Sequence, residues 1–219
     1  LKNHAHKKPC LAGRLQWVRK ERLRRRDGCL ELVFEQGWRL QMSEPGRRKQ
    51  ASVHLVRDPA ELGGPSGLDP LGPQFTCQGL LAAARRRNRQ LKGLLTDQRE
   101  IAGIGNAYSD EILHAARLSP LQLTANLDQA AITRLHEAIV TTLRGWIDRI
   151  SRQVGSAMPV NEQRWRRQMA VHGKYGQACG RCGQPIQRIS YAETETHYCP
   201  TCQTGGRILA DRRLSRLLR

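Results

Sequence analysis

The sequence is short of acidic residues. Its 219 residues include 19 Asp and Glu against 37 Lys and Arg, which gives a formal net charge of +18 and a pI of about 10.6. The basic residues are spread along the chain rather than collected in one tail. Such a distributed positive charge favours an anionic polymer as partner, with nucleic acid as the first expectation and an anionic membrane surface as a distant second.

Long apolar runs are also missing, and segments such as Leu80–Ala84 are among the longest. A membrane-spanning helix needs about 20 predominantly apolar residues, so a membrane span is excluded. The first residues carry no charged-then-apolar leader, and we therefore expect a cytoplasmic, nucleoid-associated protein. Hydrophobic residues still make up 39% of the chain and recur periodically, which indicates cores of modest size rather than disorder.

The residue patterns of common hydrolytic sites do not occur either. No Ser, His and Asp triad and no paired-carboxylate site stands out, so the sequence predicts no catalytic residue. His54 and His114 fall inside periodic segments and are more typical of packing residues than of ligands. His172 and His197 flank a group of cysteines, where His197 is an alternative metal ligand.

The first part of the chain has the period of two that is typical of strands. A hairpin is predicted around Gly37, because apolar residues alternate on both sides of it, with Leu30, Leu32 and Phe34 before and Trp38, Leu40 and Met42 after. Another strand is predicted at residues 53–56. Residues 61–73 are rich in Gly and Pro and predict a linker, which is the best domain boundary in the chain.

From Phe75 onward the apolar residues recur with a helical period. Thr76 is expected to cap the first helix of this part, since its side chain can accept a hydrogen bond from the first turn. Asp128 is expected to cap the longest helix in the same way. That helix keeps one apolar face from Ile132 to Ile150.

Four of the seven cysteines form two Cys-x-x-Cys pairs with sixteen residues between them: Cys179, Cys182, Cys199 and Cys202. Each pair supplies two thiolates from one turn, and sixteen residues are enough for a hairpin that returns the second pair. Because the protein then fills all four tetrahedral positions, the spacing predicts one structural Zn²⁺ per chain. A redox or iron–sulfur site is the less favoured alternative.

A glycine-containing turn, Gly103–Asn106, opens a predicted helix. Free backbone N–H groups at a helix start bind anions, and Asn106 adds a side-chain donor. Basic residues at positions 85–92 favour phosphate as that anion, whereas an ordinary turn between two helices is the alternative. The acidic pair Asp110–Glu111 is expected in the first turn of this helix, where carboxylates interact favourably with the helix dipole.

Several segments together resemble the formamidopyrimidine-DNA glycosylase and endonuclease VIII family. The similarity extends over residues 11–219. Residues 91–98, 101–113 and 119–120 look like the family's helix–two-turns–helix, and residues 198–203 look like the end of its zinc finger. Residues 198–219 resemble an extended-tail branch of the family, and residues 11–17 and 53–56 look like the later part of its N-terminal β-sandwich.

The resemblance implies an α+β fold in three parts. These are a partial N-terminal β-sandwich at residues 1–72, a helical helix–two-turns–helix domain at 73–168, and a C-terminal zinc-finger hairpin with a basic tail at 169–219. It implies a monomer that binds double-stranded DNA at a damaged base or an abasic site. In the intact family member this is base-excision repair, in which a bifunctional glycosylase and AP lyase excises oxidised bases and nicks the strand.

The resemblance also assigns residues. Lys92 and Asn106 match the family's phosphate-contacting Lys and Asn, and we expect Tyr108 and Arg87 to contact DNA with them. The four cysteines match the family's zinc ligands.

Three positions depart from the family pattern. The family's nucleophile is the amine of an N-terminal proline, followed by a catalytic glutamate, whereas this sequence begins Leu1-Lys2. Thr194 stands where many members have a finger arginine, and Gln50–Ala51 stands where they have an Arg-Phe wedge. We therefore expect an N-terminally truncated copy that binds abasic DNA but has weak or no excision activity. A non-catalytic DNA-binding protein and a zinc-containing RNA-binding protein of the translation apparatus remain alternatives.

Overall fold

The computed structural model describes residues 14–19, 28–44, 55–58, 67–155, 163–191 and 194–209. Its internal contacts divide the chain into two units, one of residues 1–62 with 152–162 and the other of residues 63–151 with 163–219. The domain boundaries at 72 and 168 remain predictions. Among the described helices, none combines the length and the apolar character that a membrane crossing requires.

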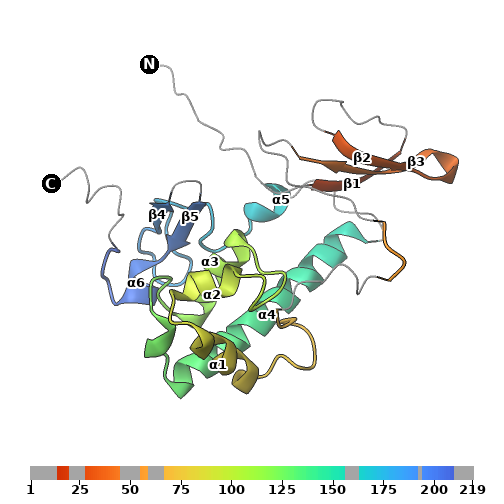
Figure 1. Ribbon diagram of the computed structural model, residues 1–219. Helices are drawn as coiled ribbons and strands as arrows, with labels where there is room; N and C mark the ends of the chain where they lie inside the picture. The colour runs from red at the N-terminus through yellow and green to blue at the C-terminus, as the bar shows by residue number, and fades with distance from the viewer. Residues whose placement is uncertain are drawn as a thin grey trace, which may run out of the picture. The chain divides into compact units, whose positions relative to one another are not determined.

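The first unit contains an antiparallel sheet in the order β1–β3–β2 (Figure 1), formed by β1 (Arg14–Arg19), β2 (Gly28–Val33) and β3 (Trp38–Ser43). The predicted hairpin is confirmed: β2 and β3 pair across a short 3-10 turn, Glu35–Gly37. Trp17 stacks on Trp38 with ring centroids 5.6 Å apart, and it contacts Phe34 at 4.9 Å. Cross-strand aromatic pairs of this kind hold two strands together.

The strand predicted at residues 53–56 is wrong where the structure describes it. Residues 53 and 54 lie outside the described part of the chain, whereas Leu55 and Val56 belong to no strand. The Leu55 side chain is fully exposed. An extended segment becomes a strand only when a neighbour accepts its hydrogen bonds, and none of the described strands pairs with these two residues.

The second unit has a helical part formed by α1 (Cys77–Arg86), α2 (Leu91–Thr96), α3 (Asn106–Ala116), a 3-10 turn (Thr124–Asn126) and α4 (Gln129–Val154). Both predicted caps are confirmed. The Thr76 side chain accepts a hydrogen bond from the Gly79 N–H at 3.0 Å, and Asp128 accepts one from the Ala131 N–H at 2.6 Å. The apolar faces meet in one core, whose fully buried members include Leu80, Leu91, Leu94, Leu95, Ile101, Ile104, Ile112, Leu113, Ile132, Leu135 and Ile139.

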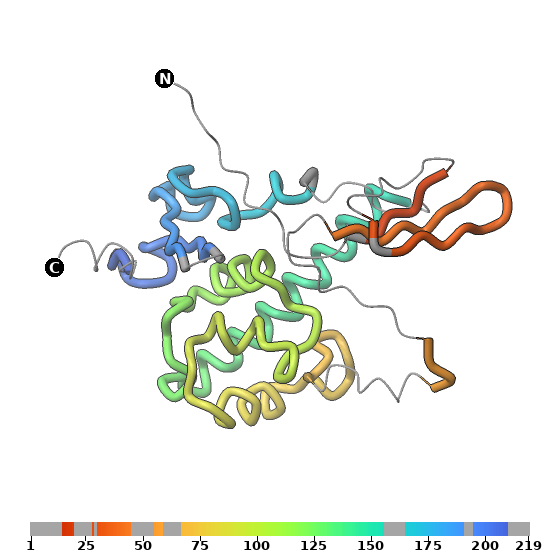
Figure 2. Tube along the Cα trace, turned by 45° about the horizontal axis from the view of Figure 1, so that its top comes forward, coloured from red at the N-terminus to blue at the C-terminus, as the bar shows by residue number. Residues whose placement is uncertain are grey.

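The same unit continues into a small C-terminal module of α5 (Gln163–Arg166), β4 (Gln187–Tyr191), β5 (Thr194–Tyr198) and α6 (Pro200–Thr204). Strands β4 and β5 form an antiparallel hairpin. In both Figure 1 and Figure 2, α3 lies between α4 and this hairpin, and α3 contacts both β5 and α6. Helix α3 therefore joins the helical core to the cysteine module.

Candidate nucleic-acid interface and metal centre

The N-terminus of α3 is open. Gly103 has a φ of +78°, a conformation that glycine adopts without strain, and Gly105 caps the helix without a side-chain hydrogen bond. A Cβ atom at either glycine would meet nothing within 4 Å. The backbone in front of α3 therefore borders open space, and the uncapped N–H groups of the first turn can bind an anion.

A hollow of about 360 Å³ lies at this turn, and its lining includes Lys92, Gln98, Gly105, Asn106 and Thr196. Gln98 fixes the shape of the turn, because its side chain accepts from the Gly103 N–H at 2.8 Å and donates to the Ile104 carbonyl at 2.9 Å. Sequence reasoning did not identify this role of Gln98. No periodicity reveals it, since the residue lies between two helices.

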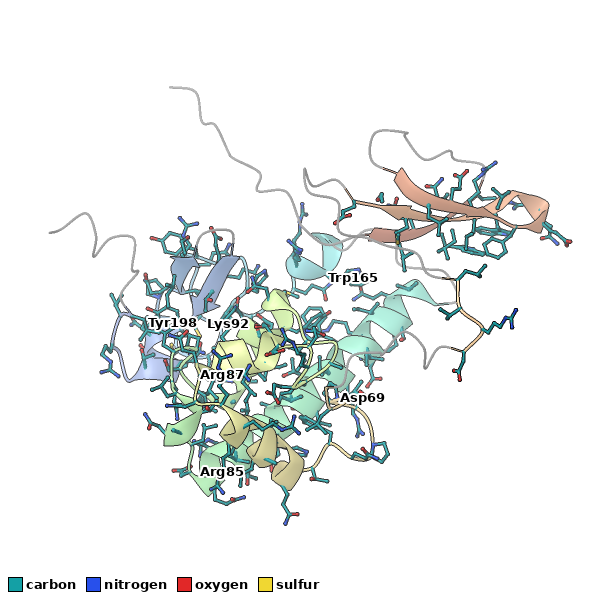
Figure 3. The ribbon with its side chains drawn as sticks, viewed as in Figure 1. Asp69, Arg85, Arg87, Lys92, Trp165 and Tyr198 are labelled. Carbon is teal, nitrogen blue, oxygen red and sulfur yellow. The ribbon has the colours of Figure 1, made fainter. Side chains whose placement is uncertain are left out.

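Lys92 supplies positive charge to the hollow. Its ammonium group donates to the carboxylate of Asp110 and to the Asn106 carbonyl oxygen, the latter at 3.3 Å. Burial lowers the pKa of Lys92, whereas the negative charge of Asp110 opposes that change. Lys92 is a residue of α2, and Figure 3 shows it near the β4–β5 hairpin. The Lys92 side chain is 13% exposed, so it remains accessible from the hollow.

Asn106 also lines the hollow and is hydrogen-bonded to the β4–β5 hairpin. Its side-chain amide donates to the Glu195 carbonyl oxygen of β5 at 2.9 Å. The structure thus brings together Lys92 and Asn106, two of the residues that sequence analysis predicted. Lys92 is hydrogen-bonded to Asp110, and Asn106 is hydrogen-bonded to Glu195.

The other two predicted DNA-binding residues lie elsewhere. Tyr108 is half-buried, and its ring meets Trp146 of α4 edge-on with centroids 5.9 Å apart. Arg87 follows the end of α1, and its side chain is exposed. Neither residue lines the hollow around Asn106. Positions 106 and 108 differ by about 200° around a helix axis, which explains why Tyr108 packs on the opposite side.

The acidic pair on α3 does not cap the helix, and that expectation was wrong. Helix α3 begins at Asn106, so Asp110 and Glu111 lie beyond its first turn, and both are buried. The Glu111 carboxylate accepts three backbone N–H groups of residues 170–172, at 2.7, 2.9 and 3.0 Å. This carboxylate therefore anchors the segment that leads into the cysteine module.

Asp110 anchors the module at a second point. Its Oδ2 atom lies 2.8 Å from His172 Nδ1 and accepts the backbone N–H of His197 at 3.2 Å. Burial alone would raise the pKa of Asp110, but the hydrogen bonds from the two histidines and the charge of Lys92 outweigh it and lower the pKa to about 2. His197, the alternative zinc ligand by sequence, therefore lies beside Asp110 rather than among the cysteines.

The four predicted metal ligands converge. All four Sγ atoms lie within 4.8 Å of one another, with Cys182 to Cys199 at 3.4 Å and Cys179 to Cys202 at 4.0 Å. These separations exceed a disulfide bond of about 2.05 Å and suit four thiolates around one ion. Burial raises the pKa of the Cys199 thiol to about 12. The thiol is therefore neutral without a metal, and a bound cation would stabilise its thiolate form. The four-sulfur donor set fits Zn²⁺ with no position left for water.

Residues around the four cysteines contact the metal ligands and hold them in place. His114 of α3 lies with its Nε2 atom 3.4 Å from Cys179 Sγ, and Arg181 donates to the His114 carbonyl oxygen at 2.9 Å. Gln203 accepts the Cys199 N–H at 2.8 Å and donates to the Leu118 carbonyl oxygen at 2.9 Å. Outer contacts of this kind orient metal ligands. The cluster is a structural zinc site that is built against α3.

Of the departures from the family pattern, only Thr194 falls in the described chain. It is the first residue of β5 and pairs through its backbone with Tyr191, whereas its side chain lies outside the described part. Leu1, Lys2, Gln50 and Ala51 also lie outside the described residues.

Comparison with known families gives two matches. The pattern described as "Formamidopyrimidine-DNA glycosylase H2TH domain" matches residues 66–155, which contain α1 to α4. The pattern described as "Zinc finger found in FPG and IleRS" matches residues 176–205, which contain all four cysteines. The two matches together include both the hollow before α3 and the zinc site.

Individual proteins of similar sequence point to the same family. A Mycobacterium tuberculosis protein named "Uncharacterized formamidopyrimidine-DNA glycosylase-like protein" is 44% identical over 156 residues, covering 71% of this chain and 94% of that protein. The formamidopyrimidine-DNA glycosylase of Pelotomaculum thermopropionicum is 38% identical over 139 residues, which are 63% of this chain and 50% of the enzyme. The chain thus spans about half the length of this glycosylase.

Solved structures give the same result. The chain is 28% identical to Lactococcus lactis formamidopyrimidine-DNA glycosylase, which was solved non-covalently bound to DNA containing an AP site. The TM-score is 0.70, and the match covers 88% of this chain and 70% of the other. The helix–two-turns–helix, the four-cysteine finger and these relatives agree: the chain belongs to the formamidopyrimidine-DNA glycosylase family.

Proposed function

We propose that this chain binds double-stranded DNA at abasic or damaged-base sites and serves base-excision repair at the nucleoid. The observation that carries the proposal is the uncapped N-terminus of α3, which faces an open hollow lined by Lys92 and Asn106. A DNA phosphate in that hollow would accept hydrogen bonds from backbone N–H groups, from the Asn106 amide and from the Lys92 ammonium group. The relative from Lactococcus lactis, solved with DNA that contains an AP site, supports the same partner.

The zinc module contributes by holding one wall of the hollow. Thr196 of β5 lines it, and the neighbouring Glu195 accepts the hydrogen bond from Asn106. Because Asp110 and Glu111 fasten the module to α3, the finger and the phosphate site form one rigid arrangement. The zinc ion would act on DNA binding through this arrangement.

A binding titration tests the proposal. The zinc-loaded 219-residue chain is titrated against a labelled duplex with one tetrahydrofuran abasic site, the matching intact duplex and a structured RNA. We expect the abasic duplex to bind most tightly. Lys92→Ala and Asn106→Ala should weaken binding to both duplexes, whereas the control Arg144→Ala removes one exposed charge from α4, away from the hollow, and should have little effect. Tighter binding of the RNA would overturn the proposal.

We further propose that the polypeptide of these 219 residues binds abasic sites with weak or no base excision and strand nicking. The chemistry that the family resemblance implies uses the secondary amine of an N-terminal proline to attack the sugar C1′ atom. A polypeptide produced from these 219 residues alone would begin at Leu1, whose terminal amine is primary. Ordinary lysine side chains are mostly protonated at neutral pH and are therefore poor nucleophiles.

Borohydride trapping tests this second point. The chain is incubated with labelled abasic duplex and sodium borohydride, beside a complete formamidopyrimidine-DNA glycosylase as positive control. We expect the positive control to form a covalent adduct and the 219-residue chain to form little or none. A strong adduct that maps to one residue, together with release of an oxidised base from a second duplex, would contradict the proposal.

A further inference from the structure

A second and larger hollow lies on another flank of α3. Its volume is about 800 Å³, and it is bounded by α3, by α4, by the segment after α5 and by the first cysteine turn; its lining includes Glu111, His114, Ala115, Gly145, Trp146, Arg149, Met169, Lys174, Ala178 and Arg181. None of these residues lines the hollow in front of Asn106. The proposed DNA site therefore leaves this second hollow unused.

Three cations border the second hollow without neutralising partners. Lys174 donates to the Arg167 carbonyl oxygen at 2.9 Å, and Arg181 donates to the His114 carbonyl oxygen at 2.9 Å. Arg149 lies 4.7 Å from the centre of the Trp146 ring. Within the described chain, none of the three cations forms an ion pair, so their charges are available to an anionic partner.

The only carboxylate among the lining residues is already committed. Both carboxylate oxygens of Glu111 accept hydrogen bonds from the backbone N–H groups of residues 170–172. Three cations against this one carboxylate leave the lining with a net positive charge. The chain's net charge of +18 adds to this field.

Apolar atoms also line the hollow. Most of this surface comes from the methyl groups of the exposed Ala115 and Ala178, because Trp146 and Met169 are nearly buried. Gly145 leaves room on α4, because a Cβ atom there would meet nothing within 4 Å. An occupant that fits this surface combines negative charge with at least one apolar side chain.

We propose that this second hollow is a docking site for an acidic peptide segment of a partner protein, one that carries an apolar side chain between its carboxylates. The carboxylates would pair with Arg149, Lys174 and Arg181, and the apolar side chain would cover the surface near Ala115 and Ala178. This inference is independent of the proposed DNA function, since the two hollows share no lining residue.

A nucleic-acid strand fits the second hollow less well. Single strands bind by stacking their bases on exposed aromatic rings. Trp146 is only 7% exposed, and the Arg149 guanidinium lies over its ring. A phosphate backbone would satisfy the cations but would leave the apolar atoms uncovered. An acidic peptide satisfies both.

The experiment uses the full zinc-loaded chain and a fluorescein-labelled peptide of about ten residues, rich in Asp and Glu, with a central Leu-Phe pair. A control peptide keeps the charges and replaces Leu-Phe by Ser-Ser. Fluorescence anisotropy measures binding, and zinc content and circular dichroism check that each variant is folded. We expect the control peptide to bind at least several-fold more weakly, because it cannot cover the apolar atoms.

Charge reversal locates the site. Arg149→Glu should weaken peptide binding about tenfold or more, since it places a negative charge among the peptide's carboxylates. The matched control Arg144→Glu makes the same charge change on the same helix, at an exposed position that does not line the hollow. Equal losses in both variants would show attraction to the overall charge alone and would overturn the proposal.

A substitution without a charge change provides the second variant. Gly145→Phe puts a ring into the open space of the hollow, at an exposed position of α4 where glycine is the poorer helix former. We expect it to abolish most peptide binding and to leave binding of the abasic duplex unchanged. Loss of duplex binding in Gly145→Phe, or displacement of the peptide by saturating abasic duplex, would assign the hollow to DNA and overturn the proposal.

Discussion

His114 of α3 lies 3.4 Å from the sulfur of Cys179, so the helical core and the zinc site meet at a metal ligand itself. Burial, together with the charges of Arg181 and Arg117, lowers the pKa of His114 to about 4, which keeps the imidazole neutral near pH 7. A neutral imidazole can donate Nε2–H to a zinc-bound thiolate, which only accepts. Helix α3 therefore stabilises the metal site as well as the DNA site that we propose.

Replacing His114 tests this contact. His114→Ala removes the donor to Cys179 and should lower zinc affinity by roughly 10- to 100-fold, as is typical for outer contacts of metal ligands. Competition with a chromophoric chelator measures the affinity. The control is Arg134→Ala, which changes an exposed residue of α4. An unchanged zinc affinity in His114→Ala would mean that this contact is packing only.

Metal removal gives a second prediction. The purified, reduced chain should contain one zinc ion, and chelation should unfold the module of residues 176–205 before the helical core, because the module has few buried apolar side chains of its own. Cys199→Ser should likewise lower DNA affinity, since the finger holds Asn106. Zinc analysis and circular dichroism report the two steps. A reduced sample without zinc would refute the assignment.

Salt dependence gives a third prediction. If binding neutralises about 5–8 phosphates, the slope of log affinity against log salt should be roughly −5 to −7. Lys92→Ala should make the slope about one unit shallower and weaken all duplex sequences alike, because a phosphate contact does not read bases. Anisotropy titrations at several salt concentrations measure the slope. A nearly flat response would exclude a phosphate site.

The anchor at Glu111 gives a fourth prediction. Glu111→Ala leaves three backbone N–H groups of residues 170–172 without their acceptor, two of them half-buried or buried. We expect a loss of about 2–4 kcal/mol in the free energy of unfolding, since unsatisfied buried donors are costly. Glu137→Ala on the surface of α4 is the control and should cost little. Urea denaturation of the zinc-loaded chain distinguishes the two variants.

The low pKa of Asp110 gives a pH-dependent prediction. A carboxyl group whose pKa falls from 3.8 unfolded to about 2 folded stabilises the fold above its unfolded pKa. This contribution, about 2 kcal/mol, should disappear as pH falls from about 4 towards 2. The stability difference between the wild type and Asp110→Asn should shrink over the same range. A difference between the two variants that stays constant with pH would contradict the assignment.

Local sequence was enough for several features because their causes lie within a few residues. Thr76 and Asp128 cap helices whose first turns follow them directly. The alternation around Gly37 predicts a hairpin that closes within a few residues. Each Cys-x-x-Cys turn brings two thiolates close together. The spacing between the two pairs was therefore enough to predict the zinc site from the sequence.

Only the tertiary structure decided what the polar residues of α3 do. Asp110 and Glu111 are residue types that suit a helix start, but α3 begins four residues before Asp110. Their partners in the cysteine module lie some sixty to ninety residues further along the chain. Tyr108 is a residue type that can contact DNA, and the structure shows its ring packed edge-on against Trp146. Its role as a DNA contact stays a prediction. Sequence periodicity assigns a residue to a face, but the buried partners of that face come from the packing of distant segments. That packing also creates both hollows, because each is lined by side chains from several elements.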